Sequence, residues 1–189
     1  MRGSSERFGD HDKVFADLLG KPLVRHVTDR VEPVVDEVVV NCHPRQRDRM
    51  NEIFEHEAVT LAVDDRPGAC PLAGIRRGLD AATGERAVVV ACDMPLVDRT
   101  FVEFLFERAA RVEAAIPRQA GGWYQPLQAV YAVGPFLSAI DADIDRPIEP
   151  ALDLEHVIVW DPGSVAGSAD TFYNVNTPED LDGAAAALG

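Results

Sequence analysis

Short runs of almost entirely apolar residues alternate along this chain with segments of helical periodicity, and no other feature constrains the fold as strongly. The apolar runs, rich in β-branched residues, predict strands over 38–40, 59–63, 87–91, 114–116, 128–132 and 156–160. Apolar residues at helical spacing predict helices over 14–19, 22–31, 45–54, 71–82, 98–112 and 178–188. Strands that are apolar throughout are buried on both faces, so we expect a mostly parallel sheet in a three-layer α/β/α fold.

The size of the chain is that of one domain. It has 189 residues, of which 47% are hydrophobic, and a domain commonly contains roughly 100–200 residues. The sequence shows no internal repeat and no linker. We therefore expect a single domain over 1–189.

The charge balance is strongly acidic. There are 32 acidic and 18 basic side chains, a formal net charge of −14, and Lys13 and Lys21 are the only lysines. A surface this negative repels phosphate backbones and anionic lipids, which disfavours nucleic-acid and membrane-surface binding. An acidic excess with so few lysines favours an origin in a salt-rich cytoplasm, although a GC-rich genome explains the preference for arginine equally well.

The cysteines and histidines do not form the pattern of a disulfide framework or a metal site. Cys42, Cys70 and Cys92 are odd in number and widely spaced, and the five histidines are scattered. No apolar run approaches the roughly 18 residues of a membrane span, and the N-terminus is too polar for a secretory signal. We expect a soluble, cytoplasmic protein.

Polar residues directly after strands are the first candidates for a ligand site, because ligands of such sheets bind beyond the carboxyl ends of the strands. Asn41, Asp64, Asp65 and Asp93 come at such points. A carboxylate there suits Mg²⁺, which takes oxygen ligands and often uses only one or two carboxylates beside substrate phosphates. The alternative for each of these residues is a turn or cap without a ligand.

The loop over 3–13 contains glycine and other small residues and carries Arg7 and Lys13. Such a loop lets backbone N–H groups approach an anion, while the two cations neutralise it. The G-K-[ST] ending of a Walker A loop is missing. In so acidic a chain the grouping of Arg7, Lys13 and Lys21 is unusual, and it favours a phosphate site over the alternative of a disordered polar terminus.

A set of short motifs, spread over nearly the whole chain, resembles a known family. The motifs are Gly3-x-x-x-Arg7-x-Gly9-x-x-Asp12-Lys13 with Leu19-Gly20-Lys21-Pro22-Leu23, Pro67-Gly68-x-x-Pro71-Leu72-Ala73-Gly74, Ala91-Cys92-Asp93-Met94-Pro95-Leu96, Gln125-Pro126-Leu127, and Asn174-Val175-Asn176-Thr177-Pro178-Glu179-Asp180-Leu181. In this order they resemble nucleotidyltransferases of the molybdenum cofactor guanylyltransferase type. The resemblance implies the Rossmann-like, mostly parallel sheet of the nucleotidyltransferase (nucleotide-diphospho-sugar transferase) fold.

The start of the chain departs from that family. There, a first, central strand and a Leu-Ala-Gly-Gly turn precede the opening motif, whereas this sequence begins Met1-Arg2-Gly3. Gly3 matches the second glycine of the turn, so the first strand is missing. A sheet without an interior strand exposes two edges or is closed by its neighbours. We expect a start codon assigned too late, the alternative being a damaged product.

The resemblance implies roles for residues on the nucleotide side. Lys13 and Arg7 would hold the triphosphate and, with Asp93, carry the catalysis, and Asp93 would bind Mg²⁺. Asp65 matches the family's base-recognition aspartate, and a carboxylate can accept from both N1–H and the exocyclic amine of guanine. The remaining nucleotide-binding residues that the resemblance implies are Gly3, Asn41 and Gly74. A turn would explain Asn41 equally well, and helix packing would explain Gly74 equally well.

On the side of the second substrate the resemblance implies Gln125, Asn174 and Asn176. Gln125 stands where the family often has histidine. Asn174 and Asn176 alternate on an extended segment, and Asn176 with Thr177 also suits the cap of the last helix. The aromatic pair at 123–124 would suit stacking on a pterin, although a buried pair is the commoner arrangement.

The resemblance implies transfer of GMP from GTP to the terminal phosphate of molybdopterin, with release of pyrophosphate and formation of the molybdopterin guanine dinucleotide cofactor. The implied partners are GTP, molybdopterin and, beyond them, molybdoenzymes or their maturation factors. A close alternative is a transferase of the same fold that uses CTP or acts on a sugar phosphate or a cobamide precursor. A second alternative is a non-catalytic protein that binds GTP or a maturation partner, because the opening turn is cut short.

Overall fold

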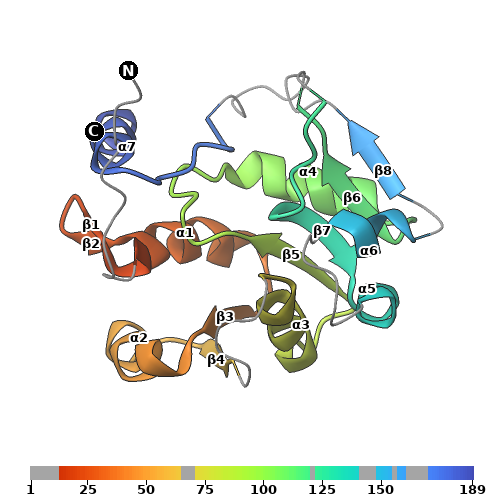
Figure 1. The fold of residues 1–189 in the computed structure, drawn as a ribbon, viewed down its shortest axis with the longest axis horizontal. Coiled ribbons are helices and arrows are strands. Elements are labelled where there is room, and N and C mark those ends of the chain that lie inside the picture. The colour runs from red at the N-terminus through yellow and green to blue at the C-terminus, as the bar shows by residue number, and fades with distance from the viewer. Residues whose placement is uncertain (1–12, 65–70, 120–121, 141–147, 155–156, 161–169) are drawn as a thin grey trace, which may run out of the picture.

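The computed structural model describes residues 13–64, 71–119, 122–140, 148–154, 157–160 and 170–189, and over these ranges helices alternate with strands (Figure 1). The strands are β1 (Asp17–Leu18), β2 (Lys21–Pro22), β3 (Val38–Cys42), β4 (Val59–Val63), β5 (Arg86–Val90), β6 (Ala114–Pro117), β7 (Gln128–Ala132) and β8 (Val157–Trp160). The α-helices are α1 (Leu23–Val31), α2 (Arg47–Ile53), α3 (Pro71–Ala81), α4 (Arg99–Ala109), α5 (Val133–Ala139), α6 (Ile148–Leu152) and α7 (Pro178–Leu188). The 3₁₀ helices are η1 (Lys13–Phe15), η2 (Glu32–Val34) and η3 (Pro44–Gln46).

The largest sheet has the strand order β5–β7–β6–β8. β7 pairs antiparallel with both β5 and β6, whereas β6 and β8 are parallel. β5, β6 and β8 therefore run in one direction, as expected for a mostly parallel sheet, and β7 is the exception within it. β7 is reversed because only residues 118–127 connect β6 to β7, and a parallel connection needs a crossover of about a dozen residues or more.

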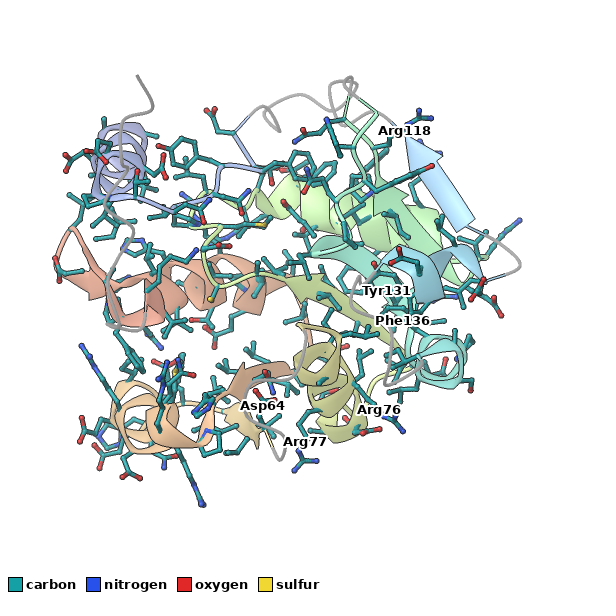
Figure 2. The ribbon with its side chains drawn as sticks, viewed as in Figure 1. Asp64, Arg76, Arg77, Arg118, Tyr131 and Phe136 are labelled. Atoms are coloured by element: carbon teal, nitrogen blue, oxygen red, sulfur yellow. The ribbon has the colours of Figure 1, made fainter. Side chains whose placement is uncertain are left out.

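Helices cover both faces of this sheet. On one face Val89 and Tyr131 pack with α3, α5 and α6, and the Tyr131 ring stacks on Phe136 of α5 with centroids 4.1 Å apart (Figure 2). On the other face Val88 and Val130 pack with α4, and Val88 also contacts the apolar side of α1. Neighbouring residues of one strand thus face opposite helical layers, which confirms the predicted three-layer α/β/α fold.

The parallel pair β3–β4 forms a sheet of its own. Among the described strands, none pairs with the second edge of β3 or of β5. Two helices bridge the pair and the larger sheet. α1 places Val24 in the cluster of Val40 and Val27 in the cluster of Val88, and α3 contacts β3 and β4 while its Leu72 packs with the larger sheet.

The predicted helix over 14–19 is wrong, because the chain there forms η1 followed by the hairpin β1–β2. Leu19 and Gly20 have φ angles of 55° and 80°, which no α-helix allows and which suit the centre of a type I′ hairpin turn. The N–H of Gly20 donates to Asp17 Oδ1 (3.1 Å). Leu18 is buried all the same, because the hairpin packs against α7.

Most other predicted elements are confirmed, with ends shifted by a few residues. Asp98 caps α4 as expected, since its Oδ1 accepts from the N–H of Phe101 (2.9 Å). α5 and α6, of 7 and 5 residues, were not predicted, because both are shorter than the window of about 11–18 residues over which helical periodicity is recognised. Within the described ranges, no helix combines the length and the apolar character needed to cross a membrane.

Candidate active site

Three side chains from distant parts of the sequence meet beyond the carboxyl end of β5. Lys13 of η1 donates from Nζ to Asp93 Oδ2 (2.6 Å) and to Asn176 Oδ1 (3.0 Å). Asp93 follows β5, and Asn176 precedes α7. All three were predicted as site residues, and the structure brings them into direct contact.

The carboxylate of Asp93 is not a turn cap. The backbone oxygen of Asp93 accepts from the N–H of Val175 (2.9 Å), which joins the turn after β5 to the segment that carries Asn176. In the side chain, Oδ2 accepts from Lys13, whereas Oδ1 is buried and has no hydrogen-bond partner among the described residues. A buried carboxylate oxygen without a donor is costly, so Oδ1 of Asp93 is an atom that a further ligand would satisfy.

A capping box fixes Asn176. Thr177 Oγ1 accepts from the N–H of Asp180 (3.2 Å), and Asp180 Oδ2 accepts from the N–H groups of Asn176 and Thr177 (2.8 Å each). The backbone N–H of Asn176 is the main cause that lowers the pKa of Asp180, and Lys13 makes a smaller contribution. Asn176 therefore has both expected roles, since its backbone joins the helix cap while its side chain reaches Lys13.

Asn174 lies on the same extended segment, but its amide is used locally. Its Nδ2 donates to the backbone oxygen of Phe172 (3.0 Å). Val175, between the two asparagines, is fully buried, whereas Asn174 is partly exposed and Asn176 is exposed. Contact of Asn174 with a second substrate stays a prediction.

A second group of predicted residues meets at the ends of β3 and β4. Asn41 Nδ2 donates to the backbone oxygen of Ala62 (3.0 Å) and to Asp64 Oδ1 (2.8 Å), so Asn41 is not a turn residue. A Cβ added to Gly74 of α3 would lie 2.7 Å from Asn41 Oδ1. Glycine at this position therefore lets α3 approach the strand end, and a contact of Gly74 with a base stays a prediction.

Three predicted site residues, Gly3, Arg7 and Asp65, lie outside the described part of the chain. Their assigned roles in binding the nucleotide stay predictions. Asp64, the neighbour of Asp65, is described, and its carboxylate faces Asn41.

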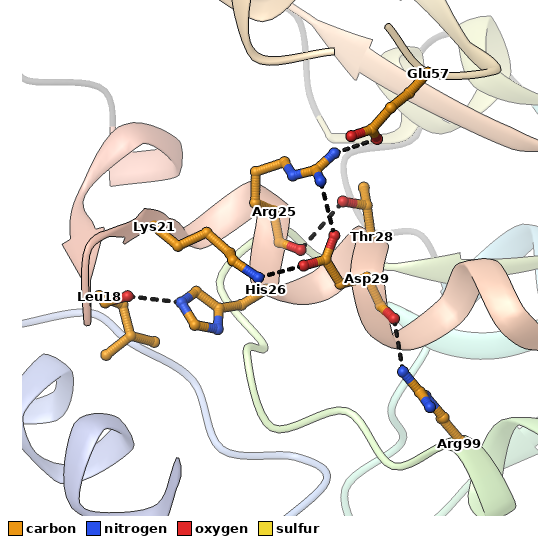
Figure 3. Close-up of polar contacts among 8 residues, drawn as sticks. All are labelled: Leu18, Lys21, Arg25, His26, Thr28, Asp29, Glu57 and Arg99. Atoms are coloured by element: carbon orange, nitrogen blue, oxygen red, sulfur yellow. Dashed lines mark hydrogen bonds and ion pairs between the residues drawn. The ribbon is translucent and has the colours of Figure 1, made fainter. Parts of the chain in front are cut away.

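Lys21 does not join Lys13 in one cluster of cations. Its Nζ pairs with Asp29 Oδ2 (2.5 Å), and Asp29 is also paired with Arg25 (3.2 Å), which in turn pairs with Glu57 (Figure 3). These contacts link α1 to the loop before β4. Lys21 therefore has a structural partner, and of the expected cation group only Lys13 reaches the site within the described ranges.

The connection between β6 and β7 carries Gln125, whose backbone N–H donates to the oxygen of Pro117 (2.9 Å). The aromatic residues of this connection do not form a buried pair, because Trp123 is 75% and Tyr124 37% exposed. The Arg118 guanidinium, labelled in Figure 2, lies 5.7 Å from the centroid of the Tyr124 ring. Exposed rings beside an arginine form a surface on which a planar anionic ligand can stack.

The donor atoms suit a magnesium ion shared with phosphates rather than one enclosed by protein. Among the described residues no group of three or more His, Cys, Asp or Glu side chains could hold a metal ion. Mg²⁺ keeps several waters and uses one or two carboxylates plus phosphates, and Asp93 Oδ1 offers an unpaired carboxylate oxygen. The neighbouring Cys92 is a poor competing ligand, because burial raises the pKa of its thiol to about 11.

Two further residues, Asp64 and Asp180, contact predicted site residues. Asp64 directly follows β4 and was among the strand-end candidates, but it was given no role of its own. Asp180 was not predicted at the site, although the sequence Thr177-Pro178-Glu179-Asp180 has the spacing of a capping box. That spacing could have revealed its role from the sequence.

Comparisons with known proteins identify the family to which this chain is similar. Residues 3–155 match the family model described as the MobA-like NTP transferase domain. The chain is 42% identical over 185 residues to a probable molybdenum cofactor guanylyltransferase of Natronomonas pharaonis, and 36% identical over 182 residues to a molybdenum cofactor guanylyltransferase of Pseudomonas putida; each alignment covers 95% of this chain and 91% of the relative. A solved structure of molybdopterin-guanine dinucleotide biosynthesis protein A from Archaeoglobus fulgidus superposes with a TM-score of 0.77 at 28% identity, covering 98% of this chain and 94% of that one.

Proposed function

Because this chain belongs to the MobA-like NTP transferase family, we propose that it transfers GMP from GTP to the terminal phosphate of molybdopterin, with release of pyrophosphate. Relatives named as molybdenum cofactor guanylyltransferases support this choice of substrates. The product is the molybdopterin guanine dinucleotide cofactor, and molybdoenzymes or their maturation factors are the partners that would receive it.

The observation that carries the proposal is the contact between Lys13 and Asp93. The two side chains are 28% and 19% exposed, so an incoming nucleotide can reach them. Without a nucleotide, Lys13 neutralises Asp93. A triphosphate offers the ammonium of Lys13 several charged acceptors, and turning toward them leaves both carboxylate oxygens of Asp93 free for Mg²⁺.

The reaction needs little general-base catalysis, because a phosphate monoester is already largely ionised at neutral pH. The work left for the protein is in-line positioning of the reactants and neutralisation of charge. Lys13 holds the phosphate oxygens, and Asn176, fixed by its capping box, orients the ammonium of Lys13. When bound, Mg²⁺ stabilises the charge that develops on the α-phosphate and the departing pyrophosphate.

Pyrophosphate release from each of the four NTPs, measured with molybdopterin present, tests the proposal. We expect GTP to be the only one of the four NTPs from which pyrophosphate is released. Release with CTP would replace GMP transfer by CMP transfer, and release only with a sugar phosphate or cobamide precursor would replace molybdopterin as acceptor. Binding of GTP without any release would favour the non-catalytic alternative. An Asp93→Ala variant that keeps the far-UV circular dichroism of the wild type should release none.

A further inference from the structure

A buried polar pair joins β7 to the segment that leads to α7. Gln128 Nε2 donates to Thr171 Oγ1, and the same oxygen accepts from the backbone N–H of Asp98 (3.0 Å), the cap of α4. Both lone pairs of the Thr171 hydroxyl are therefore used. The side chains of Gln128 and Thr171 are fully buried, so neither is accessible to a substrate. An effect of this pair on the reaction must act through other residues.

The pair is an unfavourable way to fill a core. Gln128 Oε1 is buried and has no hydrogen-bond partner among the described residues, and an apolar side chain of similar volume would avoid the cost of that oxygen. What the pair adds is direction, because a hydrogen bond weakens steeply when its angle changes, whereas apolar packing tolerates small shifts. A bond from a residue of the sheet to Thr171 therefore specifies where the segment after β8 lies.

The pair is close to the candidate active site. Gln128 pairs in the sheet with Val90, the last residue of β5, and Asp93 follows three residues later. The segment that begins at Thr171 returns to the same place, because the N–H of Val175 donates to the backbone oxygen of Asp93 (2.9 Å). The short stretch between Thr171 and Val175 is thus attached at both ends.

Asn174 lies on this stretch and depends on its first attachment. Asn174 Nδ2 donates to the backbone oxygen of Phe172 (3.0 Å), the residue after Thr171, and the ring of Phe172 packs edge-on against Phe101 of α4 with centroids 5.4 Å apart. No donor among the described residues bonds to Asn174 Oδ1. Asn176, by contrast, is held by the capping box of α7. Of the two asparagines, Asn174 is therefore the one whose place is set from Thr171.

We propose that Gln128 and Thr171 are positioning residues for the acceptor half of the reaction. They fix the backbone at Phe172, whose carbonyl orients the amide of Asn174, and Asn174 Oδ1 then accepts a hydrogen bond from the second substrate. The inference rests on the proposed function and adds to it two buried residues that touch neither substrate. The contacts of Lys13 do not involve the pair, so its loss should affect the acceptor and spare GTP.

Measurements that separate the two substrates test the inference. Thr171→Val removes the hydroxyl, Thr171→Ser keeps it, and Thr28→Val is the matched control, since it removes a buried hydroxyl from α1. We expect Thr171→Val to raise KM for molybdopterin about tenfold, as for the loss of a hydrogen bond, and to leave the Kd of GTP with Mg²⁺ unchanged in calorimetry. Thr171→Ser and Thr28→Val should behave as the wild type does. Equal weakening of both substrates, or an equal effect of Thr28→Val, would overturn the inference.

A double-mutant cycle shows whether the pair acts through Asn174. If it does, the double variant Thr171→Val/Asn174→Ala raises KM for molybdopterin no further than Asn174→Ala alone. Additive losses would show that Thr171 acts by another route. An unchanged KM in Asn174→Ala would show that Asn174 does not contact the acceptor. Either result contradicts the proposal.

Hydrogen exchange in the protein without substrates gives a second test, which applies even if Thr171→Val does not fold. Gln128→Met replaces the amide by an apolar side chain of similar volume. We expect it to accelerate exchange of the Val175 N–H about tenfold by loosening the segment, although Gln128 does not touch Val175. The N–H of Ala132, hydrogen-bonded at the other end of β7, is the control and should exchange as in the wild type.

Unchanged exchange at Val175, or equal acceleration at Ala132, would overturn the inference, since the pair would then not hold the segment or would stabilise the whole strand. Failure of the proposed function has a different signature. It would appear as wild-type protein that binds GTP and transfers no GMP to molybdopterin, while exchange at Val175 still depends on Gln128.

Discussion

At the scale of single residues, the two lysines of the chain differ in their partners and in their exposure to solvent. Lys13 bonds to Asp93 and Asn176, and the side chains of Lys13 and Asp93 are largely shielded. Lys21 pairs with Asp29 at a more exposed place, 45% accessible at the lysine. Exposed ion pairs contribute little because water and salt screen them. Of the two lysines, Lys13 is the one that contacts the candidate active site, and the proposed function assigns the catalytic role to it.

Replacing Lys13 by methionine keeps the side-chain length and removes the charge. We expect Lys13→Met to reduce kcat/KM for pyrophosphate release about 10²–10³-fold, comparable with the loss of one preorganised donor at a reacting centre. Lys21→Met is the matched control and should stay within about a factor of two or three of the wild type. Equal losses in the two variants would show that net charge, and not the position of Lys13, governs the reaction.

At the scale of elements, α3 joins the nucleotide side of the site to the sheet. Its Gly74 lies against Asn41, while Gly78, one turn later, would have nothing within 4 Å of an added Cβ. The two glycines therefore have different effects. Gly74 permits a close approach of helix and strand, whereas Gly78 lowers helix stability and allows no close contact that a larger side chain would prevent.

The pair of variants Gly74→Ala and Gly78→Ala separates these effects. Gly78→Ala should raise the free energy of unfolding by about 0.5–1 kcal/mol through helix propensity and leave KM for GTP unchanged. Gly74→Ala should displace the Asn41 amide, cancel that gain and raise KM for GTP severalfold. Denaturant unfolding and steady-state kinetics measure the two quantities. An unchanged KM in Gly74→Ala would mean that Asn41 does not contact the nucleotide.

A second contact between elements, that of Glu37 with the loop before β5, has a stability that depends on pH. Glu37, just before β3, accepts from the N–H groups of Gly84 (2.8 Å) and Thr83 (2.7 Å) in the loop before β5. The hydrogen bond from Gly84, followed by that from Thr83, lowers the pKa of Glu37 in the folded protein. Because the folded pKa is depressed, this stabilisation is complete above the unfolded carboxyl value of about 4.3 and is lost as the pH falls through the folded value.

The expected result is a pH-dependent difference between the wild type and Glu37→Gln. At pH 7 the variant should unfold more easily by about 0.5–1 kcal/mol, a modest effect because the carboxylate is accessible to water. The difference should shrink as the pH falls below about 4. Thermal unfolding at several pH values measures it, with Glu52→Gln on the exposed side of α2 as control. A difference that persists unchanged at low pH would rule out the charge of Glu37 as its cause.

The elements themselves could be predicted largely because their signals are local. The apolar run at 87–91 marks β5, and the carboxylate that follows it, Asp93, proved to be at the site. The contacts of Lys13 with Asp93 and Asn176 span 80 and 163 residues of sequence, so they depend on the topology and could be anticipated only by resemblance. The turn at Leu19 was missed because a non-glycine residue with positive φ leaves no compositional signal.

At the scale of the whole molecule, the acidic side chains outnumber the basic side chains that could pair with them. The chain carries 32 acidic and 18 basic side chains, so even complete pairing of the basic groups would leave a net charge of −14. Self-repulsion of this excess opposes the compact state. Salt weakens the individual ion pairs but also screens the repulsion, since the Debye length falls from about 10 Å at 0.1 M to about 3 Å at 1 M.

We expect the repulsion to dominate, so that raising the salt concentration from 0.1 M to 1 M NaCl at pH 7 raises Tm by several degrees. Calorimetry at the two concentrations measures the shift, and the same experiment near the isoelectric point of about 4.6 is the control. There the net charge vanishes, and the screening of ion pairs should leave Tm unchanged or lower. A fall in Tm at pH 7 would show that the ion pairs around Asp29 and Asp93 outweigh the acidic excess. An equal rise at both pH values would assign the effect to exclusion of salt from the protein surface rather than to charge.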